Sequence, residues 1–190
     1  MTEPTTTKPT WTLADSEALY RVKDWGQDLF QINDQGNLAV CPTGLHGPQI
    51  DLKQLTDDLE QRDLSAPLLI RFTDILKYRL DAIAGAFAKA IADHDYQGAY
   101  QAVYPIKVNQ QRHVVEEMLE HGSAHRFGLE AGSKPELLAV MAMVDDPDTP
   151  IICNGFKDAS FIEAVILATK LGKNIIPVIE KFSELQLIID

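Results

Sequence analysis

Cysteine is scarce in this chain, which has only Cys41 and Cys153 among its 190 residues. No C-x-x-C pair occurs, and more than half of the sequence separates the two cysteines. A disulfide framework or a structural zinc site needs thiols in closely spaced pairs. The sequence therefore argues against both, and it favours a reducing compartment such as the cytoplasm.

Positive charge is also scarce, since 17 basic residues face 28 acidic ones and the formal net charge is −11. Surfaces that bind nucleic acids or anionic membranes are basic, so we expect neither partner. No apolar run approaches the roughly 20 residues that span a bilayer. The polar, Thr/Pro-rich segment 1–10 lacks the apolar core of a signal peptide and is expected to be a disordered tail.

Motifs of other enzyme classes are missing. The chain has no phosphate-binding P-loop, no G-x-G-x-x-G and no G-x-S-x-G, so nucleotide binding and serine hydrolysis have no support. Among the five histidines, only His121 and His125 have the spacing of a helical zinc pair. Gly122 is expected to end the helix between them as a left-handed cap, which removes their shared face.

A regular alternation of strand and helix signals dominates the second half. Strands are predicted to start near Ala99, Arg126, Pro150 and Asn174, at intervals of 24 to 27 residues. Helical patterns lie between them, at about 110–121, 133–144 and 158–171. Repeated strand–helix units imply a parallel sheet covered by helices. Within them, Ser133 and Glu136 have capping-box spacing, and Gly172 is expected to be a left-handed cap.

The first half has weaker but distinct signals. Segments 29–32 and 37–40 flank a polar turn and predict a β-hairpin. Asp51 is expected to cap a helix, segment 67–72 reads as a buried strand, and a long amphipathic helix is expected beyond Thr73. The chain therefore combines a small strand and helix region with an α/β region.

One short segment carries a chemical signal. The stretch 99–104 favours a strand, and Pro105 lacks the N–H that a central strand would use, so the strand should end there. In parallel α/β barrels the carboxyl ends of the strands carry the chemistry. Lys107 is therefore placed at the mouth of a site, where a lysine amine can form a Schiff base. For an isolated lysine, a side chain that simply extends into solvent is the alternative.

The motifs Tyr104–Gln110 and Gly128–Leu137 closely resemble those of the biosynthetic arginine decarboxylases, which are pyridoxal-phosphate enzymes with an alanine-racemase-like barrel. This is the class-II family of ornithine, lysine and arginine decarboxylases. The resemblance covers nearly all of the chain beyond the first ten residues and includes further segments: Trp25–Gly26, Pro67–Phe72, Ile151–Asp158 and Val178–Lys181.

The resemblance implies an α/β fold class, namely the N-terminal part of a pyridoxal-phosphate-binding (β/α)8 TIM-type barrel. Residues 67–190 would form the first part of this barrel, and residues 11–66 would join a β-domain that later sequence completes. A full barrel needs eight strand–helix units, and the chain supplies about four. We therefore expect an N-terminal fragment of a longer enzyme, inactive by itself.

For the longer enzyme, the resemblance implies decarboxylation of L-arginine to agmatine and carbon dioxide, the first step of a route to putrescine and spermidine. Lys107 would hold pyridoxal 5′-phosphate as a Schiff base, and Glu130 would lie near the lysine and the ring as a second catalytic and cofactor-binding residue. Ser133 is a weaker cofactor-binding candidate, because helix capping alone explains it. Asn154 and Glu180 also follow predicted strands, where loop contacts explain them equally well.

For the other parts of the site that the resemblance implies, this sequence offers no candidate residues. Mg²⁺ is implied by the family alone, and the sequence locates no ligands for it. A glycine-rich phosphate clamp, an acidic partner of the pyridine nitrogen and a cysteine donated by a second subunit of a dimer-based homo-oligomer are all expected beyond Asp190. The substrate-specificity loops are expected there too.

Two other interpretations stay open. The chain could belong to a non-catalytic pyridoxal-phosphate-binding barrel, or it could be an inactive structural or regulatory fragment. Single-domain relatives of the first kind lack the β-domain. The predicted hairpin and the extended Gly128–Leu137 motif therefore favour the two-domain enzyme.

Overall fold

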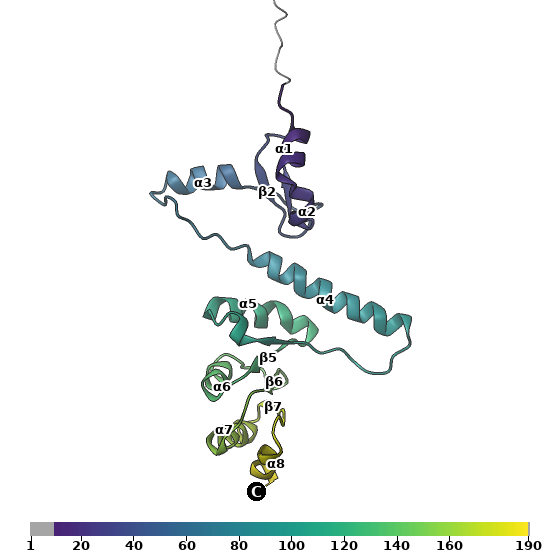
Figure 1. Cartoon of the computed structure of the whole chain (residues 1–190), viewed down its shortest axis with the longest axis vertical. Coiled ribbons are helices and arrows are strands. Elements are labelled where there is room, and N and C mark those ends of the chain that lie inside the picture. Colours follow the sequence, from purple (N-terminus) through teal and green to yellow (C-terminus); the bar gives the residue numbers. More distant parts are fainter. Residues whose placement is uncertain (1–9, 190) are drawn as a thin grey trace, which may run out of the picture. The chain divides into compact units, whose positions relative to one another are not determined.

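The computed structural model describes residues 10–189, and its backbone divides into two compact units, one ending at Tyr78 and the other beginning at Arg79 (Figure 1). The disordered tail expected at 1–10 lies almost wholly outside the described residues. Among the residues that are described, no helix is both long enough and apolar enough to cross a bilayer.

The first unit contains the predicted hairpin. Strands β1 and β2 pair antiparallel, with Phe30 opposite Val40, and β3 pairs with the other side of β2. Gly36 supplies the left-handed conformation of the hairpin turn, with φ of +81°. The elements of this unit are α1 (Leu13–Tyr20), α2 (Val22–Gly26), β1 (Phe30–Ile32), β2 (Leu38–Val40), β3 (Ile50–Asp51) and α3 (Leu52–Glu60).

Asp51 joins the small sheet to α3. One carboxylate oxygen accepts hydrogen bonds from the side-chain amides of Asn33 and Asn37, at 2.8 and 2.9 Å. The other accepts from the backbone N–H of Gln54 at 3.1 Å, so the predicted helix cap is confirmed. These donors, with Asn37 the strongest, hold the pKa of Asp51 at about 2, below the ordinary 3.8.

The prediction of a buried strand at 67–72 is wrong. This segment has no regular secondary structure, and the side chain of Leu69 is 77% exposed. A strand is stabilised by the backbone hydrogen bonds of a neighbour, and within residues 10–189 no strand pairs with this segment. The long helix predicted beyond Thr73 is confirmed as α4 (Thr73–Asp93).

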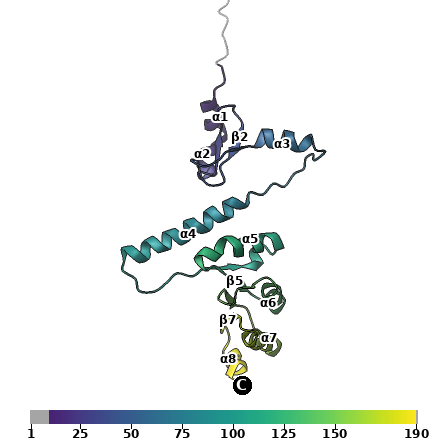
Figure 2. The ribbon, with the colours of Figure 1, turned by 180° about the vertical axis from the view of Figure 1, so that it is seen from behind.

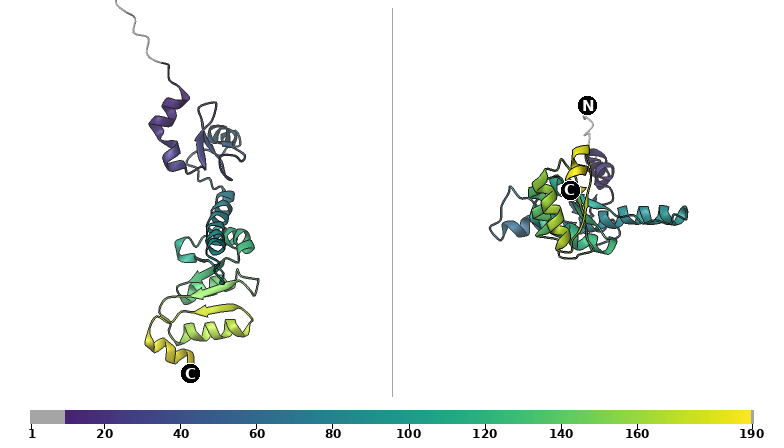
Figure 3. Two further views of the ribbon diagram at one scale, coloured as in Figure 1. Left: turned by 90° about the vertical axis from the view of Figure 1, so that its right-hand side faces the viewer. Right: turned by 90° about the horizontal axis from the view of Figure 1, so that it is seen from below.

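The second unit is a four-stranded parallel sheet in the order β4-β5-β6-β7. Helices α6 and α7 lie on the same side of this sheet when it is viewed from the front and from behind (Figures 1 and 2), as right-handed crossovers require. The right-hand view of Figure 3, taken from below, shows α7 beside the strands, so that the sheet and its helices form two layers. The elements are β4 (Val103–Pro105), the 3-10 turn η1 (Ile106–Val108), α5 (Arg112–Gly122), the 3-10 turn η2 (Ser123–His125), β5 (Gly128–Ala131), α6 (Lys134–Met141), β6 (Pro150–Cys153), α7 (Ala159–Lys170), β7 (Asn174–Pro177) and α8 (Phe182–Ile189).

The core of this unit lies between the central strands and the helices. Leu129, Ile151 and Cys153 are fully buried, and Leu137 of α6 and Phe161 of α7 pack with them. All four residues of β5 are buried, as expected for a central strand of a parallel sheet. The predicted α/β class with a parallel sheet is therefore confirmed.

Two local predictions are wrong in detail. The first strand begins at Val103, so residues 99–102 lie outside it. Gly122 has φ of −79° and does not form a left-handed cap; Arg126, with φ of 55°, takes that conformation instead. A Cβ on Gly122 would lie 2.6 Å from Cβ of Phe127, so close packing explains this glycine. Gly172 does have a positive φ, of +82°, as predicted.

The low pKa of Asp51 predicts how acid affects the first unit. Because the folded state favours the ionised carboxylate, its stabilisation is complete above the ordinary pKa of 3.8 and is lost as pH falls towards 2. Thermal unfolding of the chain and of Asp51→Asn, followed by circular dichroism, should show a gap in Tm that narrows over this range. A gap that is constant with pH would contradict the assignment.

Candidate active site

The parallel register brings the carboxyl ends of the four strands to one edge of the sheet. Pro105 is paired with Glu130, and Cys153 is paired with both Ala131 and Pro177. The loops that follow the strands therefore leave from the same edge, which we call the carboxyl edge. It carries all the candidates taken from the sequence: Lys107, Glu130, Ser133, Asn154 and Glu180.

Lys107 lies in η1, directly after β4, and its side chain is exposed. Its neighbour Ile106 is buried in the core and anchors the turn. The hydroxyl of Tyr104 donates to the backbone carbonyl of Asn109 at 3.2 Å and closes the loop. The chain thus holds the backbone of this turn in place while the lysine amine stays accessible.

Glu130 is the last but one residue of β5 and lies inside the protein, only 3% exposed. Its Oε1 accepts a hydrogen bond from Nδ2 of Asn154 at 3.1 Å. Its Oε2 is equally buried, yet no group among residues 10–189 donates to it. Buried carboxylate oxygens are normally satisfied, because losing hydration without a replacement costs free energy. This oxygen can therefore accept a hydrogen bond from a ligand.

Ser133 is used as a helix cap. Its hydroxyl accepts from the backbone N–H of Glu136 at 3.4 Å, which confirms the predicted N-cap of α6. The reciprocal half of the capping box is not formed. Glu136 instead accepts from the N–H of Gly132 at 2.6 Å and from the side chain of Gln110 at 3.0 Å. It thereby joins the loops that follow β4 and β5.

The loop after β6 is pressed against the loop after β5. Gly155 has φ of +76°, and a Cβ on it would lie 2.1 Å from the carbonyl oxygen of Gly132. The N–H of Asn154 donates to the carbonyl of Ala131 at 2.9 Å, and the N–H of Gly155 donates to Oε1 of Glu180 at 2.6 Å. Only glycine fits at position 155, and the two loops are fixed against each other.

A buried ion pair, missed by the sequence analysis, holds the same loop. Nζ of Lys157 lies 3.3 Å from Oε2 of Glu184, with side chains 0% and 2% exposed, and Nζ donates to the carbonyl of Gly155 at 2.5 Å. The backbone N–H groups of Glu180 and Lys157, together with the ammonium, lower the pKa of Glu184 to about 2. A separation of 27 residues gives no sequence pattern that could reveal this pair.

Two other chemical possibilities at this sheet fail. Burial raises the pKa of the Cys153 thiol to about 11, which leaves little thiolate for nucleophilic chemistry. His121 and His125 have separate carboxylate partners, Glu117 at 2.8 Å and Asp81 at 2.6 Å, so they share no site. Over the described range 10–189, no three His, Cys, Asp or Glu residues cluster as metal ligands.

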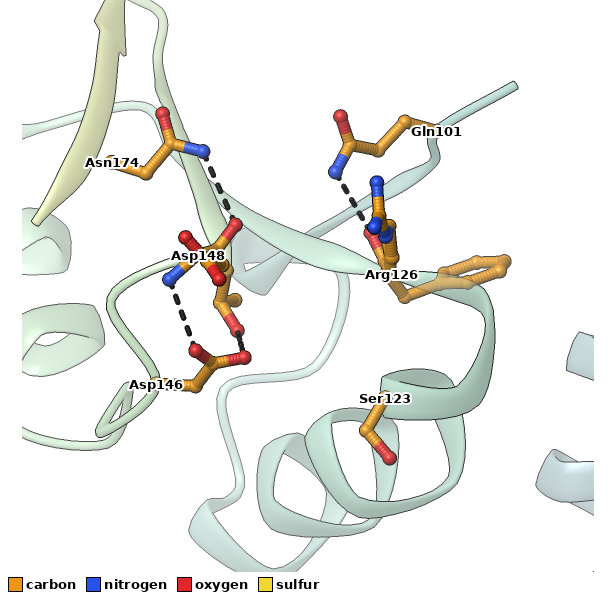
Figure 4. A pocket seen from close by; sticks show the side chains of 8 residues that line it. Gln101, Ser123, Arg126, Asp146, Asp148 and Asn174 are labelled. Atoms are coloured by element: carbon orange, nitrogen blue, oxygen red, sulfur yellow. Dashed lines mark hydrogen bonds between the residues drawn. The ribbon is translucent and has the colours of Figure 1, made fainter. Parts of the chain in front are cut away.

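A polar hollow of about 500 Å³ lies at the opposite edge, where the strands begin (Figure 4). Its groups largely satisfy one another: Asn174 donates to the carbonyl of Asp148 at 3.2 Å, and Gln101 to that of Arg126 at 3.3 Å. It lacks both the lysine and the buried carboxylate, so the carboxyl edge is the better candidate. The lining residues are Gln101, Ser123, Arg126, Phe127, Asp146, Asp148, Thr149 and Asn174.

Comparison with known families shows the family to which the chain belongs. The family model described as "Pyridoxal-dependent decarboxylase, pyridoxal binding domain" matches residues 82–190, more than half of the chain. The chain belongs to this family of decarboxylases. Its matched region contains β4 to β7 and all the candidates of the carboxyl edge.

Individual relatives agree with this assignment. Proteins named biosynthetic arginine decarboxylase from Thermosynechococcus vestitus and Gloeobacter violaceus are 51% and 50% identical, over 92% and 95% of this chain. The crystal structure of the biosynthetic arginine decarboxylase SpeA from Campylobacter jejuni matches 90% of the chain with a TM-score of 0.82 and 35% identity, which confirms the predicted fold class. The chain spans only 27% to 28% of the length of these relatives.

The tight contact between the two loops predicts that Gly155→Ala is strongly destabilising. The new methyl group would meet a backbone oxygen in an unfavourable φ region, at a cost of about 3 kcal/mol or more. Gly172→Ala is the matched control, because Gly172 also has a positive φ but has open space around it, so about 1 kcal/mol is expected. Urea unfolding of both variants measures the difference. Equal losses would contradict the proposed contact.

The buried pair predicts a strong coupling between Lys157 and Glu184. Lys157→Met should lower Tm, because it leaves a buried carboxylate without its counter-charge, and it should lower Tm much less in a Glu184→Gln background. Lys89→Met is the control, since it breaks an exposed ion pair with Asp93 on α4 and should change Tm little. Additive effects of the two buried substitutions would show that the pair is not coupled.

Proposed function

We propose that the full-length protein carrying this chain is a pyridoxal-phosphate-dependent decarboxylase that converts L-arginine to agmatine and carbon dioxide. The observation that carries the proposal is the carboxyl edge. There an exposed lysine follows β4 and a buried, half-satisfied glutamate lies near the end of the neighbouring β5, in a chain about 50% identical to arginine decarboxylases. A cytoplasmic step in the synthesis of putrescine and spermidine is the corresponding cellular role.

The residues at the carboxyl edge fit pyridoxal phosphate. The accessible amine of Lys107 is the nucleophile that would attach to the aldehyde of the cofactor, and the buried Oε2 of Glu130 can accept from a donor on the bound group. When bound, the pyridine ring supplies an electron sink for the charge that departing carbon dioxide leaves behind. Lys107 and Glu130 are therefore proposed as catalytic residues.

The chain's own contacts define what each residue contributes. The buried Ile106 and the hydrogen bond from Tyr104 hold the turn that presents Lys107. Glu130 is immobilised by Asn154 and keeps one oxygen for the reacting group. Ser133 is proposed as a contributor to anion binding through the N-terminal turn of α6, with its hydroxyl already occupied as a helix cap.

The rest of the proposal concerns the assembled enzyme. Residues 67–190 would form the first part of the barrel and residues 11–66 would contribute to a β-domain, within a dimer-based homo-oligomer. In support, β7 lies at one edge of the sheet, and its residue Ile176 is 46% exposed. A partly uncovered sheet leads us to propose that the 190-residue chain alone is inactive. Mg²⁺ is proposed on the family resemblance only.

Lys107 gives the most direct test of the proposed role. The full-length protein is mixed with pyridoxal phosphate, reduced with borohydride, digested and mapped by mass spectrometry. The label should be found on Lys107. Lys107→Ala should abolish labelling at this position and the release of carbon dioxide from arginine, because no other side chain on the described edge offers an amine in the turn after β4.

The control is Lys170→Ala, which removes an exposed lysine at the end of α7 and should leave labelling and turnover unchanged. Ornithine, lysine and diaminopimelate serve as competing substrates. A label on a different residue, or full turnover by Lys107→Ala, would refute the assignment. Faster turnover of a competing substrate would refute arginine as the substrate.

A further inference from the structure

Asn154 directly follows β6, and both its backbone and its side chain form hydrogen bonds to residues of β5. Its backbone N–H donates to the carbonyl of Ala131, so it extends the ladder between β5 and β6 by one residue. The next residue, Gly155, is fixed by two hydrogen bonds. Its N–H donates to Glu180, and its carbonyl accepts from Nζ of Lys157. The position of the Asn154 side chain is thereby set from both directions along the chain.

The side chain of Asn154 has no part in starting the following helix. Asp158 is the N-cap of α7 and accepts from the N–H of Phe161 at 2.8 Å. The loop itself is anchored by Glu180 and by the Lys157–Glu184 pair. The structural tasks in this loop are therefore filled by other residues, and the amide of Asn154 is directed at the carboxylate of Glu130.

This hydrogen bond makes the two oxygens of Glu130 unequal. An ionised carboxylate only accepts, so the asparagine must present its NH₂ group to Oε1, and a neutral amide satisfies that oxygen without cancelling the charge. Oε2 is left buried and available. Without the amide, the carboxylate could turn about its terminal bond, and both oxygens would lack a donor.

We propose that Asn154 is a positioning residue, which fixes Glu130 through Oε1 so that Oε2 faces an N–H or ammonium donor at the carboxyl edge. The identity of that donor as part of the cofactor–lysine site rests on the proposed function. The hydrogen bond between Asn154 and Glu130 does not depend on it. The two claims can therefore be tested separately.

The first experiment uses the protein without cofactor and follows the side-chain NH₂ signals of asparagine by ¹⁵N NMR. The Asn154 amide should be protected from hydrogen exchange, and Glu130→Ala should accelerate its exchange roughly tenfold, because it removes the acceptor. The Asn174 amide, which bonds a backbone carbonyl at the opposite edge, should be unaffected. Unchanged exchange of Asn154 in Glu130→Ala would overturn the positioning role, whatever the protein binds.

The second experiment measures the binding of pyridoxal phosphate to the full-length protein by absorbance across a range of pH. Asn154→Ala should weaken binding roughly ten- to hundredfold, the range expected for a hydrogen bond to a charged group. Asn154→Asp should weaken it further, because it sets a second carboxylate beside Glu130. In both variants the acidic limb of the binding profile should move to higher pH. Asn174→Ala and Asn174→Asp are the matched controls and should bind as the unmodified protein does.

The outcomes separate the two claims. If the unmodified protein fails to bind pyridoxal phosphate, the proposed function fails, and the exchange experiment still decides the role of Asn154. If Asn154→Ala loses affinity and Tm with an unchanged pH profile, the residue is only structural and the positioning role is overturned. If the pH profile of Asn154→Ala is shifted while its Tm equals that of the Asn174→Ala control, the positioning role is supported.

Discussion

The register of the parallel sheet is the constraint on which the site depends. Because Pro105 is paired with Glu130 and Ala131 with Cys153, the strands end at one edge and their loops leave together. A slip of one residue in β5 would turn Glu130 away from its present environment, since side chains alternate between faces. The buried Leu129 opposes such a slip, because its side chain would leave the core cluster in which it packs with Ile151.

Three charged residues are buried in the described part of the chain, and they differ in how fully their polar atoms are hydrogen-bonded. Lys157 and Glu184 satisfy each other and the backbone of the loop after β6. Glu130 is only half satisfied. Burying a carboxylate oxygen without a donor opposes stability, and such features are characteristic of functional sites. The fully satisfied pair supports the loop, and that loop in turn carries the asparagine that orients the unsatisfied residue.

Much of this arrangement follows from local sequence. Short-range sequence patterns are enough to predict three features: the hairpin around Gly36, the cap at Asp51 and the strand–helix units after Val103. The strand predicted at 67–72 failed because strand formation depends on a partner, which an apolar run does not reveal. The left-handed cap predicted at Gly122 failed because close packing on Phe127 also requires glycine. Lys107, Glu130 and Asn154 could be placed at strand ends, but the bond from Asn154 to Glu130 and the pair of Lys157 with Glu184 are long-range contacts that leave no periodic pattern.

The central claim is that the carboxyl edge holds pyridoxal phosphate between the lysine after β4 and the glutamate of β5. A crystal structure of the full-length protein grown with the cofactor tests this most directly. The account predicts continuous density from Nζ of Lys107 to the cofactor, with a donor of the bound group or of Lys107 within hydrogen-bond distance of Oε2 of Glu130. Cofactor bound elsewhere, for example in the polar hollow beside Arg126, or a Glu130 whose Oε2 still faces no donor, would contradict it.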